Sequence, residues 1–272
     1  MKKNFRIFVS FLLFWILKII SKIFIKSKIK ILPPLGDKKS FKFDFSQKTR
    51  RLVFRKDEES FGKIIFDSSL NESPLCDLGK NYNTNKSGIN LSGHRSGYTN
   101  LYNLLFTNLK NKKCSIAEIG IEKNASTKMW RKYFRKASID CFEIDKDKIS
   151  FAKKQKLKGV KYHFIDVQNK KIIDSQFKKL KKKFDLIIDD STHIFDHQIN
   201  IIFNTYKYLK QDGILIIEDI YRHRKGYEEK RYYNSLKKLK KNFSDIVFIE
   251  TSHVNNYTAS WGCEKILLLI KK

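Results

Sequence analysis

The stretch FDLIIDDSTH, residues 184–193, decides the fold of this chain together with GILIIED, residues 213–219. Each contains a short run of apolar, mostly β-branched residues that stops in two adjacent carboxylates. Such a run is typical of a strand that is buried on both faces of a parallel sheet. The carboxyl ends of these strands open onto the ligand crevice of an α/β fold. Acidic side chains there, with the imidazole of His193 beside them, predict a metal and a general base.

Short β-branched runs alternate with helical patterns on both sides of these two stretches. Expected strands cover residues 115–119, 139–144, 162–165, 186–189 and 214–218, and expected helices lie near 125–136, 147–158, 172–182 and 195–210. Strands that alternate with helices form βαβ units in a mostly parallel sheet with helices on both faces. Residues 246–250 and 265–270 are expected to close the sheet as an antiparallel pair, and residues 98–109 belong to a helical lead-in. The predicted fold class is therefore α/β.

The first 32 residues differ from the rest of the chain. Residues 7–17 are almost wholly apolar, and lysines then recur every fourth residue from Lys18 to Lys30. The apolar run is short for a spanning helix, which needs about 20 residues. Lysines along one side of an amphipathic helix fit an anchor whose apolar face enters the lipid. We expect residues 1–32 to attach the protein to the cytoplasmic face of a bacterial inner membrane, with a signal peptide or a spanning anchor as alternatives.

A proline pair marks the end of this anchor segment. Pro33 and Pro34 cannot continue a helix, and Gly36 loosens the turn that follows. The next stretch is polar with short aromatic alternations, so residues 33–73 are expected to be linker or edge structure. Residues 74–272 are expected to form the main domain with its helical lead-in.

The composition excludes some classes of partner. The net charge of +29 comes mostly from lysines that are scattered over the expected helices. Nucleic-acid binders more often show arginine-containing patches or a recognisable module, so no nucleic-acid partner is expected. The four cysteines lack the paired spacing of a zinc or redox site. The lysines are therefore interpreted as solvated helix faces that also suit an anionic membrane or glycan.

A second motif, AEIGIEKNAS at residues 117–126, predicts a strand, a turn and a helix. Gly120 allows the backbone to approach a ligand, and Ser126 is expected to cap the helix. Glu143 ends the next strand about 20 residues further on, where dinucleotide-type folds place an acid on ribose hydroxyls. The alternative is that Glu143 caps the helix that starts near Lys146.

These motifs together resemble a known family. Residues 118–120 (EIG), residues 126–130 (STKMW) and residues 184–193 are similar to class I S-adenosylmethionine-dependent methyltransferases. More narrowly, they resemble metal-dependent sugar O-methyltransferases of the macrocin O-methyltransferase type, over about residues 74–270. The resemblance implies a Rossmann-like fold with a mostly parallel seven-stranded sheet, helices on both faces and an antiparallel last strand. It also implies S-adenosylmethionine as cofactor and Mg²⁺ or Mn²⁺ as metal.

The resemblance also implies a role for individual residues. It implies that the metal ligands are Asp190, Glu218 and Asp219 and that the general base is His193. The cofactor-binding residues that it implies are Glu118, Gly120, Ser126, Glu143, Asp166 and Asp189. A lone acid at a strand end is more often a cap, but clustered like charges repel, which favours a bound cation. A divalent cation on hard oxygen ligands lowers the pKa of a bound hydroxyl, and a histidine can then take its proton.

The chain departs from the family pattern at two places. Residues 82–86 (YNTNK), with His94 and Tyr98, resemble an element that closes over the cofactor, but Asn85 replaces the usual aspartate. This leaves the role of Lys86 open. Residues 124–125 (NA) replace a glycine pair in the cofactor loop, where asparagine tolerates a positive φ best among the other residues.

Two further histidines and the nature of the acceptor complete the predictions. His197 is a candidate substrate contact, and His163 is expected in the strand before Asp166. We predict an O-methyltransferase for a sugar hydroxyl in cell-surface glycan or other glycoside biosynthesis, with lipid-linked glycans among its substrates and a homo-oligomer left open. The alternatives are a catechol-type small-molecule O-methyltransferase and a non-catalytic nucleic-acid-binding module.

Overall fold

The structure is a computed structural model that describes residues 52–55, 61–67, 73–87, 96–252 and 265–272. The predicted membrane anchor, residues 1–32, lies outside the described residues, as does much of the segment 33–73. No helix in the described part of the chain has the length and hydrophobicity to cross a bilayer. Attachment to a membrane and the domain boundaries therefore stay predictions.

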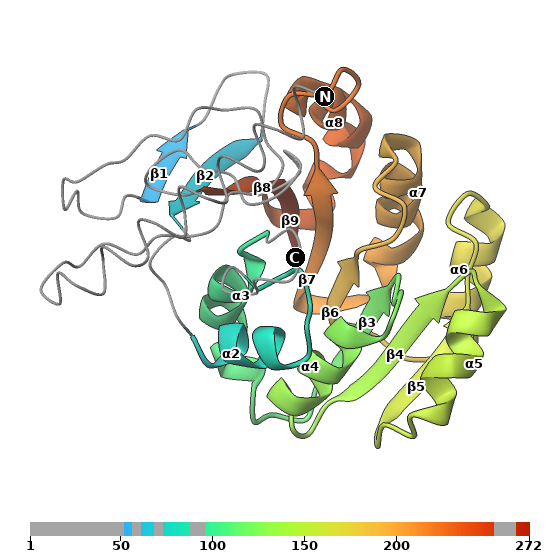
Figure 1. Cartoon of the computed structure of the whole chain (residues 1–272). Helices are drawn as coiled ribbons and strands as arrows, with labels where there is room; N and C mark the ends of the chain where they lie inside the picture. Colours follow the sequence, from blue (N-terminus) through green and yellow to red (C-terminus); the bar gives the residue numbers. More distant parts are fainter. Residues whose placement is uncertain (1–51, 56–60, 68–72, 88–95, 253–264) are drawn as a thin grey trace, which may run out of the picture.

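A single mixed sheet forms the centre of the molecule (Figure 1). Its strands are β1 (Leu52–Arg55), β2 (Gly62–Asp67), β3 (Ser115–Ile119), β4 (Ser138–Glu143), β5 (Val160–Phe164), β6 (Phe184–Asp189), β7 (Leu209–Ile220), β8 (Phe243–Ser252) and β9 (Lys265–Lys271). They lie in the order β1-β2-β8-β9-β7-β6-β3-β4-β5. Strands β3 to β7 pair in parallel, whereas β9 runs antiparallel to both of its neighbours, β7 and β8. The predicted α/β class and the antiparallel last strand are confirmed.

The sheet has nine strands in its described part, two more than the seven that were predicted. The additional strands are β1 and β2, which pair antiparallel with each other and form one edge of the sheet. β2 lies parallel to β8, and nearly the whole sequence of the domain separates these two strands. A pairing between segments so distant in sequence leaves no local pattern, so no periodicity within β1 or β2 could identify it.

Helices cover both faces of the sheet (Figure 1). The helices are α2 (Pro74–Asn81), α3 (Tyr98–Phe106), α4 (Ala125–Tyr133), α5 (Lys146–Lys154), α6 (Lys170–Lys179), α7 (Phe195–Thr205) and α8 (Glu229–Leu236), with short 3₁₀ turns at Thr107–Leu109, Tyr206–Tyr208 and Lys237–Asn242. Two buried cores result, one beneath α6, α7 and α8 and the other beneath α2, α3 and α4. Side chains of consecutive residues in β6 point to opposite faces of the sheet, so Ile187 packs in the first core and Ile188 in the second.

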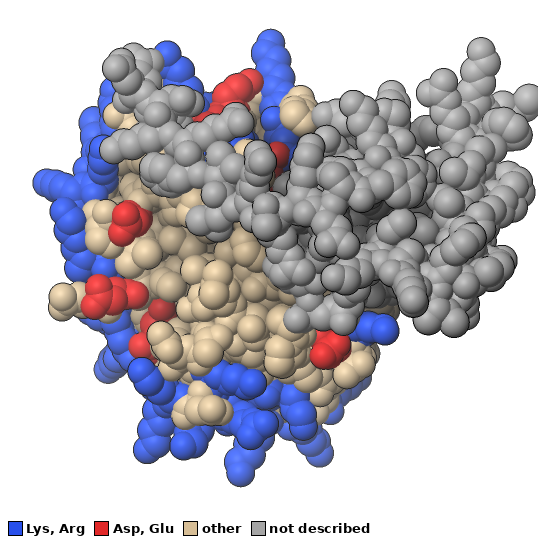
Figure 2. All heavy atoms as spheres, turned by 90° about the vertical axis from the view of Figure 1, so that its left-hand side faces the viewer, with Lys and Arg blue, Asp and Glu red and all other residues tan. Residues whose placement is uncertain are grey.

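Most of the described lysines lie at the surface, as their scatter along the sequence predicted, whereas Lys86 and Lys265 are buried. On the face shown in Figure 2, lysines and arginines gather around the rim of the described surface, and its middle carries few charges of either sign.

Candidate active site

A cavity of about 1040 Å³ opens at the carboxyl ends of β3, β4, β6 and β7. The chain runs from β3 to one edge through β4 and then continues on the other side with β6, so this is the switch point where α/β folds bind ligands. Most of the predicted site residues line the cavity: Gly120, Ser126, Glu143, Asp166, Asp190, His193 and Asp219. The remaining ones, Glu118, Asp189 and Glu218, are buried. The fold thus brings the sequence-predicted residues to one place.

Gly120 brings two loops into direct contact. Its φ is +88°, and a Cβ atom at this position would lie 2.1 Å from the backbone oxygen of Asp190. Two backbone hydrogen bonds of 2.8 Å hold the loops, one from Gly120 N to the oxygen of Phe142 and one from Asp190 N to that of Ile119. A residue with a side chain would clash here, so this contact between the two loops depends on glycine; the predicted approach of the backbone to a ligand stays a prediction.

Asn124 replaces the expected glycine at the start of α4. It adopts a left-handed conformation with φ 64° as the N-cap, and α4 begins at Ala125. Its side-chain amide donates to the hydroxyl of Tyr162 at 2.9 Å and to Gln155 Oε1 at 3.0 Å. Ser126 lies inside the first turn, so the cap expected at Ser126 is wrong: Asn124 occupies the N-cap position and makes no side-chain cap hydrogen bond. The residue that tolerates positive φ therefore occupies the position that needs it.

The Glu143 carboxylate joins the loops that follow β3 and β4. Its Oε2 accepts a hydrogen bond from Ile121 N at 3.2 Å, and its Oε1 accepts from the next two backbone amides. The cap of α5 is Asp145, which accepts hydrogen bonds from the amides of Asp147 and Lys148, so the capping alternative for Glu143 is wrong. Nearby, Asp166 accepts from Gln168 N at 2.9 Å and lines the same end of the cavity.

Glu118 is an acid beneath the cavity wall. It accepts hydrogen bonds from Thr127 Oγ1 at 2.6 Å and from Trp130 Nε1 at 2.9 Å, both on α4. Burial raises the pKa of Glu118, although the Lys86 charge opposes the rise. Its carboxylate therefore fixes α4 against the end of β3, next to the loop that joins these two elements.

Asp189 has a similar position at the end of β6. It accepts from the hydroxyl of Ser191 at 2.6 Å and from Ser191 N at 3.2 Å, which shapes the loop that carries Asp190. Burial raises the pKa of Asp189 to about 6.

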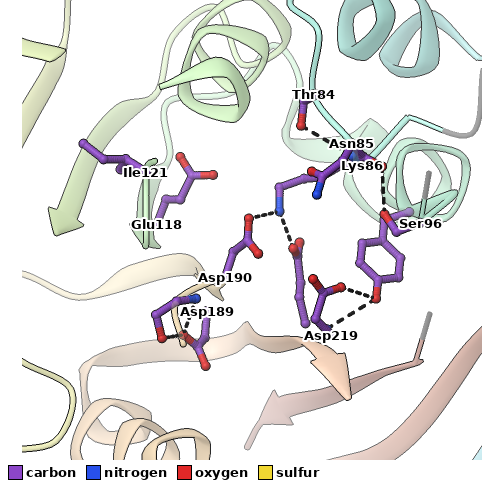
Figure 3. Close-up of polar contacts among 12 residues, drawn as sticks. Thr84, Asn85, Lys86, Ser96, Glu118, Ile121, Asp189, Asp190 and Asp219 are labelled. Atoms are coloured by element: carbon purple, nitrogen blue, oxygen red, sulfur yellow. Dashed lines mark hydrogen bonds and ion pairs between the residues drawn. The ribbon is translucent and has the colours of Figure 1, made fainter. Parts of the chain in front are cut away.

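A lysine lies among the predicted metal carboxylates (Figure 3). Lys86 Nζ is 2.6 Å from Asp190 Oδ2 and also donates to Glu218 Oε2. Burial alone would lower the pKa of Lys86, but the carboxylates of Asp190 and Glu218 outweigh it and raise the pKa. The structure therefore assigns a position to Lys86, whose role the sequence left open.

Two tyrosines of α3 hold the carboxylates at the end of β7. The hydroxyl of Tyr98 donates to Asp219 Oδ1 at 2.8 Å, and that of Tyr102 donates to Glu218 Oε1 at 2.6 Å. Residues four apart share one face of a helix, so consecutive carboxylates on the strand meet successive turns of α3. Burial raises the pKa of both Glu218 and Asp219. The sequence analysis missed Tyr102, although its spacing from Tyr98 was a usable signal.

Three side chains converge on one point at the cavity surface. Asp190, His193 and Asp219 each present a possible ligand atom, and these atoms lie within 4.8 Å of one another. His193 Nε2 is 3.5 Å from Asp219 Oδ2, and the Tyr227 hydroxyl holds the His193 backbone oxygen at 2.9 Å. Two carboxylate oxygens and open cavity space suit a hard divalent cation such as Mg²⁺ or Mn²⁺. The donor set therefore fits the metal that the resemblance implies.

The two other histidines that the sequence singled out lie elsewhere. His197 Nδ1 is 2.8 Å from Thr192 Oγ1 at the start of α7, and neither ring nitrogen belongs to the converging group. His163 lies on β5, as expected, and pairs with Asp140 at 2.8 Å.

The fold and the position of this cavity define the class of structure as the Rossmann-like class I methyltransferase fold. Among solved structures, the chain is similar to MycE, a methyltransferase from the mycinamycin biosynthetic pathway. The complex of MycE with Mg, SAH and mycinamycin VI is 20% identical, with a TM-score of 0.55 over 74% of this chain and 55% of MycE. A complex with Mg and SAH gives 19% identity, the same TM-score and the same coverage.

The chain thus spans about half the length of MycE. An O-methyltransferase from Bacillus cereus in complex with SAH is 12% identical, with a TM-score of 0.49 over 75% of this chain and 93% of that one. No protein-family model matches the chain, and no curated protein sequence is significantly similar to it. At these identities the comparisons establish the fold.

Proposed function

We propose that the protein is an S-adenosylmethionine-dependent O-methyltransferase that acts on a sugar hydroxyl with the help of Mg²⁺ or Mn²⁺. The observation that carries this proposal is the convergence of Asp190, His193 and Asp219 at the surface of the cavity. These residues share the cavity with the Gly120 loop and Glu143, so metal and cofactor positions face one space. MycE, which has the same fold, was crystallised with both Mg and SAH.

The cofactor end of the cavity is the part formed after β3, β4 and β5. Gly120 lets the backbone approach a ligand, while Glu143 and Asp166 present carboxylates where nucleoside hydroxyls and amino groups are commonly bound. S-adenosylmethionine bound there would supply an electrophilic methyl group for transfer to the acceptor oxygen, with S-adenosylhomocysteine as the other product. The chain's own part is to hold acceptor and methyl in line, which is a large share of the rate acceleration.

The acceptor end of the cavity is the part around Asp190, His193 and Asp219. A sugar hydroxyl is hardly ionised near neutral pH, and a divalent cation on Asp190 and Asp219 would lower the pKa of a hydroxyl bound to it. His193 Nε2 is positioned beside Asp219 to accept the hydroxyl proton. The left-handed backbone of His193, φ 57°, is fixed by the bond from Tyr227 and directs the ring to the cavity.

The carboxylates have a direct test. Asp190→Asn should abolish methyl transfer to the acceptor but leave S-adenosylmethionine binding within about threefold of wild type, because cofactor contacts lie at the other end of the cavity. Asp196→Asn is the matched control, since Asp196 is exposed on α7 and forms, within the described part of the chain, an ion pair with Arg231 at 3.6 Å. Full turnover by a metal-free preparation would show that the metal role is wrong.

A screen of methyl acceptors would identify the chemical class of the substrate. Methyl transfer should be measured against nucleotide sugars, lipid-linked glycans and catechols, each with and without Mg²⁺. Phenols ionise more readily than sugar hydroxyls, so a catechol methyltransferase relies less on a base. Nearly full activity of His193→Ala would therefore favour the catechol alternative.

A membrane location is part of the same proposal. The basic apolar segment at residues 1–32 would place the cavity near lipid-linked glycans on the cytoplasmic face of a bacterial inner membrane. Deletion of residues 1–30 should release the protein from the membrane fraction, and unchanged fractionation would contradict the anchor.

A further inference from the structure

We propose that Glu218 binds Lys86 and not the metal, so that Asp190 and Asp219 are the carboxylates left to hold the divalent cation. The inference rests on the metal-dependent function proposed above and changes its ligand set. Lys86 becomes a permanent cation of the site, and Glu218 becomes a positioning residue that acts through it.

The contacts of Glu218 carry the first step. Both of its carboxylate oxygens already accept a hydrogen bond, Oε1 from the Tyr102 hydroxyl at 2.6 Å and Oε2 from Lys86 Nζ. The side chain is 1% exposed, and Glu218 does not line the cavity. Asp190 and Asp219 line the cavity from which a cation would enter, whereas neither Glu218 nor Lys86 does.

Asp190 and Asp219 differ from Glu218 because each of them has one carboxylate oxygen that is available to a metal ion. Lys86 holds Oδ2 of Asp190 at 2.6 Å, and Oδ1 accepts no hydrogen bond from the described residues. Tyr98 holds Oδ1 of Asp219 at 2.8 Å, and Oδ2 faces His193 at 3.5 Å. Each of these carboxylates is therefore fixed through one oxygen and offers the other. Such outer bonds orient metal ligands in proteins.

The balance of charge carries the second step. Asp190, Glu218 and Asp219 bring three carboxylates together around the one ammonium group of Lys86, and the buried Glu118 carboxylate adds to the negative field at Lys86. A divalent cation at Asp190 and Asp219 would offset this excess of carboxylates without moving Lys86. Expulsion of Lys86 would instead require an ammonium group with a 2% exposed side chain to leave two carboxylates. Breaking a buried pair of this kind is strongly unfavourable because a charge is left uncompensated.

The two tyrosines of α3 provide a matched pair of variants. Tyr98→Phe removes the hydroxyl that orients Asp219, and Tyr102→Phe removes the one that holds Glu218. Both side chains are buried, lie one helical turn apart and lose the same hydroxyl, but the Tyr98 hydroxyl also accepts a hydrogen bond from Asp219 N at 3.3 Å. Thermal unfolding of each variant therefore separates a loss of stability from a change in metal affinity. The readout is the dissociation constant of Mn²⁺ from the full chain, measured by electron paramagnetic resonance.

The ligand set predicts different results for the two variants. Tyr98→Phe should weaken Mn²⁺ binding about tenfold, the lower end of the effect of outer-shell bonds, and Tyr102→Phe should weaken it less than about threefold. Equal losses in both variants, or no loss in Tyr98→Phe, would overturn the inference. If wild-type protein binds no Mn²⁺, the proposed metal-dependent function fails as well, so the two failures are distinguishable.

A second measurement needs no variant. Reductive methylation of wild-type protein, followed by mass spectrometry of the peptide that contains Lys86, reports whether the ammonium group is accessible. Lys86 should stay unmodified to the same extent with and without saturating Mn²⁺, because the metal does not displace it. Modification of Lys86 that rises when Mn²⁺ is added would overturn the inference.

Discussion

The contact between Gly120 and the Asp190 loop leads to a sharp prediction for Gly120→Ala. The new Cβ atom would lie 2.1 Å from the Asp190 backbone oxygen, whereas ordinary contact begins at 3.4 Å. The neighbouring atoms are backbone, so a rotamer change cannot relieve the overlap, and the loop with Asp190 must move by about 1 Å. The substitution also places alanine at φ +88°, which costs about 1–2 kcal/mol.

This displacement should affect the chemistry more than the stability. A misplacement of about 1 Å costs on the order of a hundredfold in rate, which corresponds to about 2.7 kcal/mol. We therefore expect methyl transfer by Gly120→Ala to fall about a hundredfold, with weaker binding of both cofactor and Mn²⁺. The assays are isothermal titration with S-adenosylhomocysteine and the transfer rate at saturating cofactor.

Gly159→Ala separates the clash from the backbone strain. Gly159 has a φ of +76°, but its Cβ would meet the far end of the Arg131 side chain at 3.0 Å, which can move aside. Both variants carry the same kind of strain, and only Gly120→Ala carries the backbone clash. Equal cofactor affinity and equal rate in the two variants would refute the argument.

Substitutions at three other positions test separate parts of the site. His193→Gln should lower the rate of methyl transfer at least about a hundredfold, while S-adenosylhomocysteine still binds. The contrary outcome is visible by electron paramagnetic resonance of bound Mn²⁺. If wild-type protein shows hyperfine coupling to a nitrogen and this variant does not, His193 is a metal ligand and not the base. Because burial raises the pKa of Asp189 from 3.8 to about 6, the unfolded chain releases this proton at a lower pH than the folded chain. The contribution of Asp189 to the free energy of unfolding therefore falls by about 3 kcal/mol as the pH rises from about 4 to about 7. In urea unfolding, the stability of Asp189→Asn relative to wild type should rise over the same pH range. Asn124→Ala should lower stability by about 2 kcal/mol and Asn124→Gly by less, because only glycine keeps the left-handed cap accessible; equal losses in thermal unfolding would contradict this.

The sequence predicted the parts of the site that depend on local pattern. The apolar run that ends in Asp189 and Asp190 defines both a buried strand and a carboxylate at its end, because the two facts belong to the same short segment. The same holds for β7 with Glu218 and Asp219. Gly120 could be identified because a strand, a turn and a helix follow one another directly around it.

The sequence could not predict which side chains meet these carboxylates. Lys86 reaches Glu218 across 132 positions of the chain, and Tyr98 reaches Asp219 across 121. Such contacts depend on how α3 packs on the sheet, which no periodicity within either segment encodes. For the same reason the resemblance assigned Glu218 as a metal ligand, while its surroundings in the structure support a pairing with Lys86.

The contacts of α3 also connect folding with ligand binding. Tyr98 and Tyr102 attach α3 to the ends of β7 only while Asp219 and Glu218 keep their present positions. A cation bound to Asp219 would hold that carboxylate in place, and anything that binds the folded arrangement alone stabilises it by mass action. Linkage of this kind is reciprocal, so the docked helix would raise metal affinity by the same factor as the metal favours docking. Amide hydrogen exchange in α3 would then slow as the metal concentration rises, and the lead-in helix would report occupancy of a site that lies outside its own sequence.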